Sequence, residues 1–129
     1  MNLSLVKNNQ KYYEFIRELR THEDNVSGFL IQTNITQEDQ LKYMEKYGEC
    51  YYIAINNDEI PVGFIGVVDN DIRVAVHPNF KNQGVGKFMV NEIIDNYPNS
   101  IAKIKISNTP SIKLFESCGF KSEFLIMKK

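Results

Sequence analysis

A polar turn between an apolar strand and a helical pattern is the most informative chemical feature of this sequence. The run Val74–Val76 leads into His77 and Pro78, and the turn that follows holds Gly84 and Gly86, one residue apart. The first amides of a helix have no partner within the helix, and glycine has no Cβ to block a ligand. A turn of this kind suits an anionic phosphate at the start of the following helix.

Two common nucleotide-binding motifs do not fit this turn. A Walker A loop requires a glycine where the sequence has Lys81, and a serine or threonine where it has Phe88. A dinucleotide-binding fingerprint requires a third glycine at the position of Met89. A pair of glycines also occurs where a turn merely begins a helix, so the turn alone does not identify its ligand.

Composition argues against several classes of function. The chain has 129 residues, enough for one domain (1–129) with a sizeable core, and 43% of them are hydrophobic. Its formal net charge of -1 provides no overall attraction for nucleic acid or an anionic membrane. No apolar run approaches the roughly 20 residues that a membrane span needs, and the first residues lack a signal-peptide pattern. We therefore expect a cytoplasmic protein.

Metal and disulfide chemistry find little support. Cys50 and Cys118 lie far apart and outside any CxxC pattern, which indicates reduced, mostly buried side chains. The two histidines, His22 and His77, have no cluster of acids beside them. His77 also precedes a proline, which favours an extended and structural role. We predict no metal cofactor.

Hydrophobic periodicity predicts the elements that position the turn. The expected strands are Leu3–Lys7, Cys50–Ile55, Ile60–Val68, Ile72–Val76, Ile101–Ile106 and Phe120–Met127. The expected helices are 10–22, one from an N-cap at Thr36 to Gly48, 85–97, and one from an N-cap at Thr109 to Gly119. Residues Asn25–Asn34 are expected to form a loop with a helical turn. The strand–helix–strand order around the glycines implies two parallel strands joined by a crossover.

Two motifs, in this order, resemble those of the GNAT superfamily of N-acetyltransferases. Lys81-x-x-Gly84-x-Gly86 resembles the [RQ]-x-x-G-x-[GA] acyl-CoA pyrophosphate loop of that family. The segment Asn108–Phe120 resembles its second element, N-x-x-[AS]-x-x-L-[YF]-x-x-x-G-F. The order of predicted elements is similar to the family fold over essentially the whole chain. That fold is a single-domain α/β mixed sheet with an antiparallel N-terminal meander, splayed parallel strands and about four helices.

The resemblance implies how acetyl-CoA would be held as co-substrate. The strands Ile72–Val76 and Ile101–Ile106 would splay apart, and the backbone of the first would pair with the pantetheine arm. The amides of Asn82–Lys87 would hold the pyrophosphate, whereas Ser111 and Phe115 would line the thiol end. The implied cofactor-binding residues are Val74, Ala75, Val76, Lys81, Asn82, Gln83, Gly84, Val85, Gly86, Lys87, Asn108, Ser111 and Phe115. Asn108 could equally serve only its own helix start.

The sequence departs from the family pattern in three places. Lys81 replaces an arginine or glutamine, and a lysine supplies charge without a bidentate fork. The short segment after Phe120 implies a shortened last pair of strands. Phe115 stands where many relatives have a tyrosine that protonates the departing thiolate, and phenylalanine has no proton to give. A thiol with a pKa near ~8.5 still leaves tolerably as the thiolate.

The implied reaction is direct attack of a primary amine on the thioester of acetyl-CoA. Ordered substrates and a backbone amide of the strand would lower its barrier. Because alkyl ammonium pKa values lie near ~10, a base is expected to remove a proton first. The candidates are His22, Asp71 and Glu59. The two acids are also typical turn residues, and a histidine also suits a helix C-terminus, so the catalytic residue stays unassigned.

The acceptor would be a small amine, bound by the region between the first strand and Cys50. This region is similar to that of branches acting on nucleotide-linked amino sugars or protein N-termini. Arg17 and Arg20 could contact a substrate phosphate, or pair with Glu14 and Glu18 on the helix surface. Three functions stay open: an N-acetyltransferase of a small amine such as an amino sugar, a non-catalytic acyl-CoA-binding module, and a protein N-acetyltransferase. The acyl length and the oligomeric state, a homodimer included, stay open as well.

Overall fold

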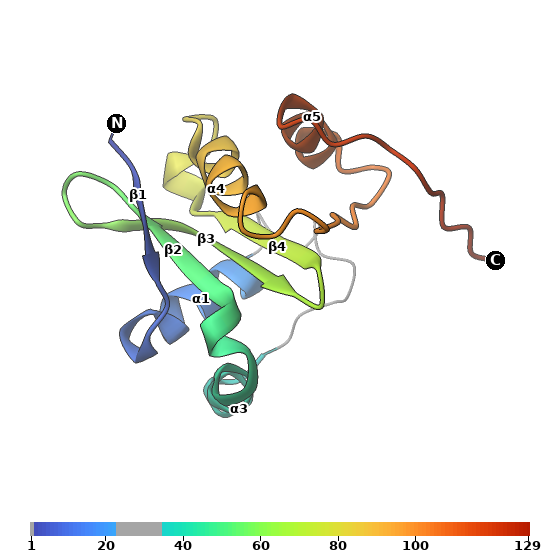
Figure 1. The fold of residues 1–129 in the computed structure, drawn as a ribbon. Coiled ribbons are helices and arrows are strands. Elements are labelled where there is room, and N and C mark those ends of the chain that lie inside the picture. The colour runs from blue at the N-terminus through green and yellow to red at the C-terminus, as the bar shows by residue number, and fades with distance from the viewer. Residues whose placement is uncertain (1, 23–34) are drawn as a thin grey trace.

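Four antiparallel strands form a sheet whose spatial order follows the order of the chain, so that β4 lies at one edge (Figure 1). The computed structural model describes residues 2–22 and 35–129. The strands are β1 (Ser4–Lys7), β2 (Tyr51–Ile55), β3 (Pro61–Val68) and β4 (Asp71–Val76). These bounds confirm the antiparallel meander that the sequence predicts, within one or two residues at each strand.

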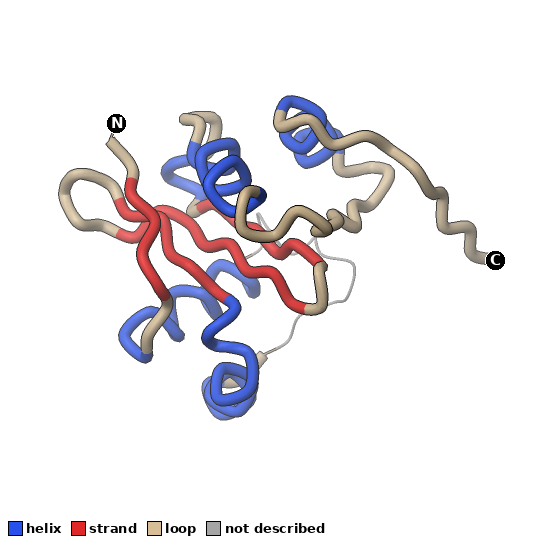
Figure 2. Tube along the Cα trace, viewed as in Figure 1, coloured by secondary structure: helices blue, strands red, loops and turns tan. Residues whose placement is uncertain are grey.

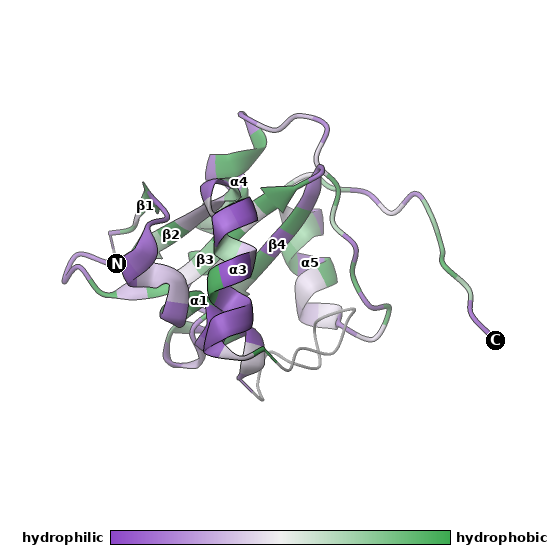
Figure 3. Cartoon of the chain, turned by 90° about the horizontal axis from the view of Figure 1, so that it is seen from below, coloured by the Kyte–Doolittle hydropathy of each residue, from purple (hydrophilic) through white to green (hydrophobic). Residues whose placement is uncertain are grey.

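Helices cover both faces of this sheet (Figure 1). On one face lie α1 (Tyr13–Thr21) and α3 (Gln37–Tyr47), and on the other lies α4 (Val85–Ile94), with α5 (Thr109–Ser117) packed against α4. Single 3-10 turns occur at Gln10–Tyr12, Gly48–Cys50 and Pro78–Phe80. This architecture confirms the predicted α/β fold class. In Figure 3, seen from the side of α1 and α3, the outer surface of α3 is largely hydrophilic.

Strand alternation divides the core into two clusters, one for each face. Under α4, the buried side chains include Ile65, Ile72, Met89 and Ile93. Under α1 and α3, they include Ile16, Met44, Tyr51, Ile53 and Phe64. Successive residues of a strand point to opposite faces, so neighbouring positions of β3 and β4 serve different clusters.

The helix starts show one confirmed cap and one displaced cap. Thr36 forms a full capping box with Asp39 at the start of α3, as the sequence predicts. At α5 the predicted cap, Thr109, is wrong by one residue. Asn108 is the N-cap, and its Oδ1 accepts a hydrogen bond from the Ser111 amide at 3.3 Å. An asparagine oxygen reaches the third amide as well as a threonine does, and here it occupies the position just outside the helix.

Two predicted strands are absent from the structure (Figure 2). Segment 101–106 makes only a single parallel bridge to β4, between Ile101 and Asp71. The segment after Phe120 is a loop whose side chains Phe124–Met127 are 68–91% exposed. Apolar alternation marks a strand only where a neighbouring edge supplies hydrogen bonds, and neither segment obtains that edge.

Two further observations complete the fold. The loop with a helical turn expected at Asn25–Asn34 lies outside the described residues. In the ranges 2–22 and 35–129, no helix combines the length and apolar character needed to cross a membrane.

Candidate functional site

The outer edge of β4 presents backbone groups that, beyond Ile72, have no backbone partner among the described residues. In the register with β3, Asp71, Arg73 and Ala75 alternate with Ile72, Val74 and Val76. The Ile72 amide points away from β3, because it donates to the Ile101 carbonyl at 2.9 Å. Since antiparallel pairing alternates along a strand, Val74 and Val76 also direct their N–H and C=O groups outward. The backbone of Ala75 faces β3 instead.

Within residues 2–22 and 35–129, this edge is closed at one end only. Ile101 donates to the Asn70 carbonyl at 2.7 Å, which together with the Ile72 bond fixes the bridge. Beyond it, no backbone hydrogen bond joins residues 102–106 to β4 in this described part of the chain. Ala102 and Ile104 instead pack against the core under α4. We call the outward groups of Val74 and Val76 the β4 edge; an extended ligand chain could pair with them as an added strand.

The polar turn after β4 is held by local hydrogen bonds. His77 Nδ1 accepts a hydrogen bond from the Asn79 amide at 3.1 Å, and the His77 amide donates to the Val62 carbonyl at 2.8 Å. This confirms the structural role predicted for His77. The side chain of Gln83 reaches the Asn79 carbonyl at 3.4 Å. Asn82 has a positive φ of 62°, a conformation that asparagine tolerates better than most residues.

This turn ends in a helix start that can accept an anion. Gly84 is the N-cap of α4 with φ 82°, and no side chain caps the helix there. The first turn of α4 contains no acidic residue, and a Cβ placed on Gly84 would meet nothing within 4 Å. Lys81 and Lys87 flank the turn and contribute positive charge. These features fit a pyrophosphate, because amides without a side-chain cap and a helix dipole both favour negative charge.

The two glycines of the turn have different structural reasons. Gly84 is needed for its left-handed backbone, which residues with a Cβ adopt at a cost. Gly86 lies inside α4, where a Cβ would come within 3.1 Å of Leu114 Cδ2 and 3.7 Å of Val76 Cγ2. Gly86 therefore allows α4 to pack closely on α5 and on the end of β4.

The second motif contributes mainly packing to the site. Asn108 caps α5, which favours its helix-start role over direct contact with a ligand. Ser111 is half-buried, and its amide is occupied by this cap. Phe115 is only 5% exposed and stacks edge to face on Phe120, with ring centroids 5.1 Å apart. Phe115 is therefore an apolar wall of the core.

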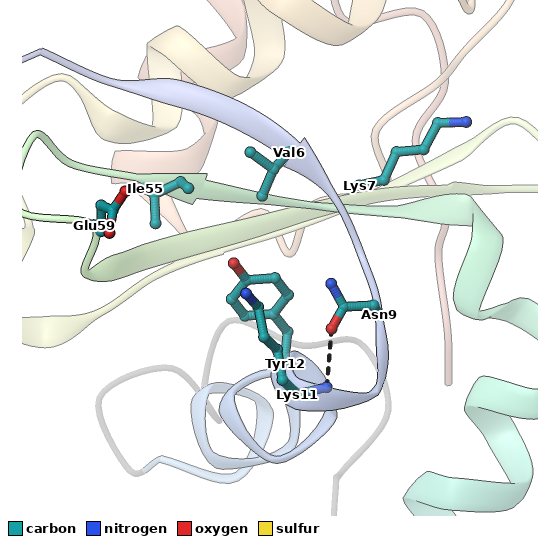
Figure 4. Close-up of a pocket in the computed structure, with 7 residues that line it drawn as sticks. All are labelled: Val6, Lys7, Asn9, Lys11, Tyr12, Ile55 and Glu59. Atoms are coloured by element: carbon teal, nitrogen blue, oxygen red, sulfur yellow. Dashed lines mark hydrogen bonds between the residues drawn. The ribbon is translucent and has the colours of Figure 1, made fainter.

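The structure separates the three candidate bases. Asp71 lies at the closed end of the β4 edge, where Oδ2 pairs with Lys103 Nζ at 3.1 Å. Glu59 lies in the β2–β3 turn, which the length of β3, about 25 Å, separates from Asp71. It lines a cavity of about 370 Å³ with residues of β1, β2 and the first 3-10 turn (Figure 4). His22 is exposed at the C-terminal end of α1. These residues do not form one acid–base group.

A polar cluster on the α1/α3 face escaped the sequence analysis. Arg73 Nη1 donates to the Tyr43 hydroxyl at 3.0 Å, and the hydroxyls of Tyr43 and Tyr51 are 2.7 Å apart. The Arg20 guanidinium lies over the Tyr43 ring, 5.2 Å from its centroid. Burial raises the pKa of the Tyr51 hydroxyl, so this phenol stays neutral beside the two arginines. A single arginine in the apolar strand 72–76 was the available signal.

Arg17 is not part of this cluster. Its guanidinium pairs with Glu14 on the same helix and donates to the Ile35 carbonyl. The hydrogen bond from Arg17 lowers the pKa of Glu14. This arrangement agrees with the helix-surface pairing considered for Arg17. In the described ranges, no group of three or more His, Cys, Asp or Glu side chains could hold a metal ion.

Comparisons with known proteins agree on one family. The family model for the acetyltransferase (GNAT) family matches residues 10–120. A curated relative, the peptidyl-lysine N-acetyltransferase YjaB of Salmonella typhimurium, is 24% identical over 71 residues. Those residues are 54% of this chain, and they span only about half (49%) of the relative.

Solved structures show the same fold at low identity. The spermidine N-acetyltransferase of Vibrio cholerae, in complex with CoA and spermine, matches with a TM-score of 0.82 and 14% identity over 95% of this chain and 82% of its own. The yncA protein of Salmonella typhimurium, solved with acetyl-CoA, matches with a TM-score of 0.76 and 18% identity over 93% and 80%. Likeness at this identity establishes the architecture around the β4 edge and leaves the substrates to be argued from the residues.

Proposed function

Because the chain belongs to the GNAT family of acetyltransferases, we propose that it transfers the acetyl group of acetyl-CoA to a primary amine of a small molecule. The observation that carries this proposal is the continuity of the β4 edge with the α4 helix start. An extended arm bound along Val74 and Val76 would lead directly to the amides behind Gly84. An amino sugar is one candidate acceptor.

The residues of this chain divide the donor site between them. The β4 edge would pair with the amides of the pantetheine arm, and the start of α4 would hold the pyrophosphate. Lys81 and Lys87 would add positive charge there. Asn108, Ser111 and Phe115 would form the wall on the α5 side. Acetyl-CoA supplies an acyl thioester, a carbon centre that an amine can attack.

The chain would promote this reaction mainly by positioning and by electrostatics. Holding an amine against a bound thioester removes much of the entropic cost of their encounter. An outward amide of the β4 edge could donate a hydrogen bond to the oxygen that gains negative charge. Phe115 offers no proton, so the leaving thiol would depart as the thiolate or take a proton from water. Asp71, Glu59 and His22 stay candidates for removing the proton of the amine, directly or through water.

A panel of amines with acetyl-CoA tests this proposal through the release of free thiol. We expect at least one small amine to accelerate release above the rate with acetyl-CoA alone. If CoA binds but no amine, sugar or peptide accelerates release, the chain is a non-catalytic acyl-CoA-binding module. The relationship to a peptidyl-lysine N-acetyltransferase favours a protein acceptor as the second candidate. Competition between a sugar amine and a lysine-containing peptide separates the two.

We further propose that the protein acts in the cytoplasm and forms a homodimer. Cys50 and Cys118 are both free thiols, as a reducing compartment favours. Large apolar side chains at Phe124–Met127 are exposed, and an interface between two copies would cover them. Light scattering on the purified protein measures the assembly directly.

A further inference from the structure

One row of residues across the sheet positions a buried tyrosine beside an arginine, and the proposed donor site uses neither side chain. Tyr51 of β2, Gly66 of β3 and Arg73 of β4 occupy adjacent positions in register. A Cβ on Gly66 would come within 2.6 Å of the Tyr51 ring. The missing side chain at Gly66 therefore lets the Tyr51 ring lie across β3 toward β4. Tyr51 is 1% exposed, so this ring is fixed in the core.

Near β4, the row meets two arginines, Arg73 and Arg20, which both contact Tyr43. The Tyr51 hydroxyl meets that of Tyr43, which accepts from Arg73 at 3.0 Å, while Arg20 lies over the Tyr43 ring. Both guanidinium groups also act electrostatically on the Tyr51 hydroxyl. We call Arg20, Tyr43, Tyr51 and Arg73 the arginine–tyrosine cluster. Its polar groups converge from α1, α3, β2 and β4.

Among the described residues, no carboxylate forms a salt bridge with Arg73, although Asp71 on the same strand acts electrostatically on its guanidinium. The salt bridges there join Arg17 to Glu14, Lys42 to Glu38 and Lys103 to Asp71. Arg73 donates to the Tyr43 hydroxyl instead, although Arg73 is only half-buried. A guanidinium has five N–H donors, and the two phenols, Tyr43 and Tyr51, occupy at most two of them. The remaining donors suit a bidentate oxyanion such as a carboxylate or phosphate.

The position of Arg73 links the cluster to the proposed reaction. Arg73 precedes Val74, whose backbone belongs to the β4 edge, and lies beside the closed end at Ile72. Its side chain points to the α1/α3 face, opposite the α4 face. A donor arm on the β4 edge and an acceptor over the α1/α3 face would thus meet at one strand.

Resting on the acetyltransferase function proposed above, we propose that the arginine–tyrosine cluster binds an oxyanion of the acceptor, so that the substrate is an amine that also carries a carboxylate or phosphate. The Arg73 guanidinium attracts such an anion and repels a polycation, and Arg20 lies nearby over the Tyr43 ring. This chain should therefore discriminate against polyamines, although a structural neighbour was solved with spermine. Selectivity would come from both the attraction and the repulsion.

Matched amines test this inference. Thiol release is measured with glucosamine 6-phosphate against glucosamine, phosphoethanolamine against ethanolamine, and an amino acid against its amide, with spermidine as the cationic arm. We expect kcat/KM for the anionic member of at least one pair to exceed that of its neutral partner about 10- to 100-fold. Phosphate and carboxylate pairs distinguish the two sources of the oxyanion. A preference for neutral members or for spermidine would overturn the inference.

Three variants locate the effect. Arg73→Gln should lower kcat/KM for the anionic amine about 10-fold or more relative to its neutral partner, so that the anionic preference is lost, and Arg73→Lys should retain part of that preference. Arg17→Gln is the matched control, because Arg17 lies on α1 but pairs with Glu14. It should keep the preference. Denaturation curves confirm that each variant folds. Equal losses for both members of a pair in Arg73→Gln would show that Arg73 has a structural role only.

A binding measurement separates this inference from the proposed function. Inorganic phosphate and acetate are titrated into the protein, and the NMR signals of the arginine side chains are followed. Saturable shifts of the Arg73 signal in the wild type, with Arg17 unaffected, support the anion site even if no amine is acetylated. The absence of such shifts for both anions refutes it, even if acetylation of neutral amines is found.

Discussion

The substitution Gly86→Val tests how the turn after β4 is built. Gly86 is the second residue of α4, and an ideal Cβ there would lie 3.1 Å from Leu114 Cδ2 and 3.7 Å from Val76 Cγ2. The first distance is too short for an ordinary contact, and valine adds two methyl groups beyond the Cβ. If Gly86 served only to let a pyrophosphate approach, the substitution would weaken acetyl-CoA binding and leave the fold intact. The geometry instead predicts a combined effect on α4 packing and on binding.

The magnitude follows from two opposing terms. Overpacking against Leu114 costs typically about 1–3 kcal/mol. Replacing glycine inside a helix returns a few tenths of a kcal/mol, because valine is the better helix former. The net expectation is a loss of about 1–2 kcal/mol in the free energy of unfolding. Acetyl-CoA affinity should fall as well, because a shift of α4 away from Leu114 would displace the N-terminal turn of the helix.

A double-mutant cycle with Leu114→Ala gives the decisive assay. Urea denaturation supplies the free energy of unfolding, and calorimetry supplies the acetyl-CoA affinity. In the Leu114→Ala background, Gly86→Val should change stability by less than about 0.5 kcal/mol, which gives a coupling energy of about 1–2 kcal/mol. In that background, Gly86→Val should also cause a smaller loss of acetyl-CoA affinity than in the wild type. Equal losses of stability and of acetyl-CoA affinity in both backgrounds would refute the packing explanation. A loss of affinity would then be explained by direct contact of Gly86 with the pyrophosphate.

Three further predictions follow from the same structure. Gly84→Ala should cost about 1–2 kcal/mol and weaken acetyl-CoA binding, because φ 82° strains a residue with a Cβ; Gly84→Asn should cost less in the same denaturation assay. Phe115→Tyr should lose about 1–2 kcal/mol in the free energy of unfolding because it buries a hydroxyl; an unchanged urea midpoint would mean that the ring edge reaches water. Burial raises the pKa of Tyr51, and a hydrogen bond with Tyr52 raises that of Tyr97 to about 12. Both phenols therefore hold their protons longer in the folded state, so stability should stay level to about pH 10 and fall as pH rises through 10–12. Tyr51→Phe should flatten this fall, and an unaltered slope would contradict the assignment.

The fold was predictable where the determining pattern is local. The meander strands and the Thr36 capping box follow from alternation and from a four-residue motif, and both are present. Segment 101–106 has equally good alternation, but strand formation there depends on whether the β4 edge accepts it. The bridge at Ile101 begins that pairing, and α5 then packs on α4, away from the strand.

The residues of the site were likewise predictable only where their signal is local in the sequence. The amides behind Gly84 could be predicted, because a glycine turn before a helix has a local meaning. For Arg20 the sequence leaves open a substrate phosphate or a helix-surface ion pair, and it suggests no role for Arg73. Their relationship to Tyr43 depends on the register that places Gly66 between Tyr51 and Arg73. That register joins three strands, and nothing in the spacing along the chain encodes it.

The alternation of β4 explains how one short strand can serve both substrates. Ile72, Val74 and Val76 direct their side chains to the α4 core, which fixes the helix whose N-terminus accepts an anion. Their backbone groups point to the outer edge, which suits a donor arm. Arg73, one position out of phase, faces the α1/α3 side and the arginine–tyrosine cluster. Because these roles depend on a period of two, a one-residue shift of β4 would reverse all of them together. The bridge at Asp71 and Ile101, reinforced by Lys103, fixes that register at the end of the strand where the two substrates would meet.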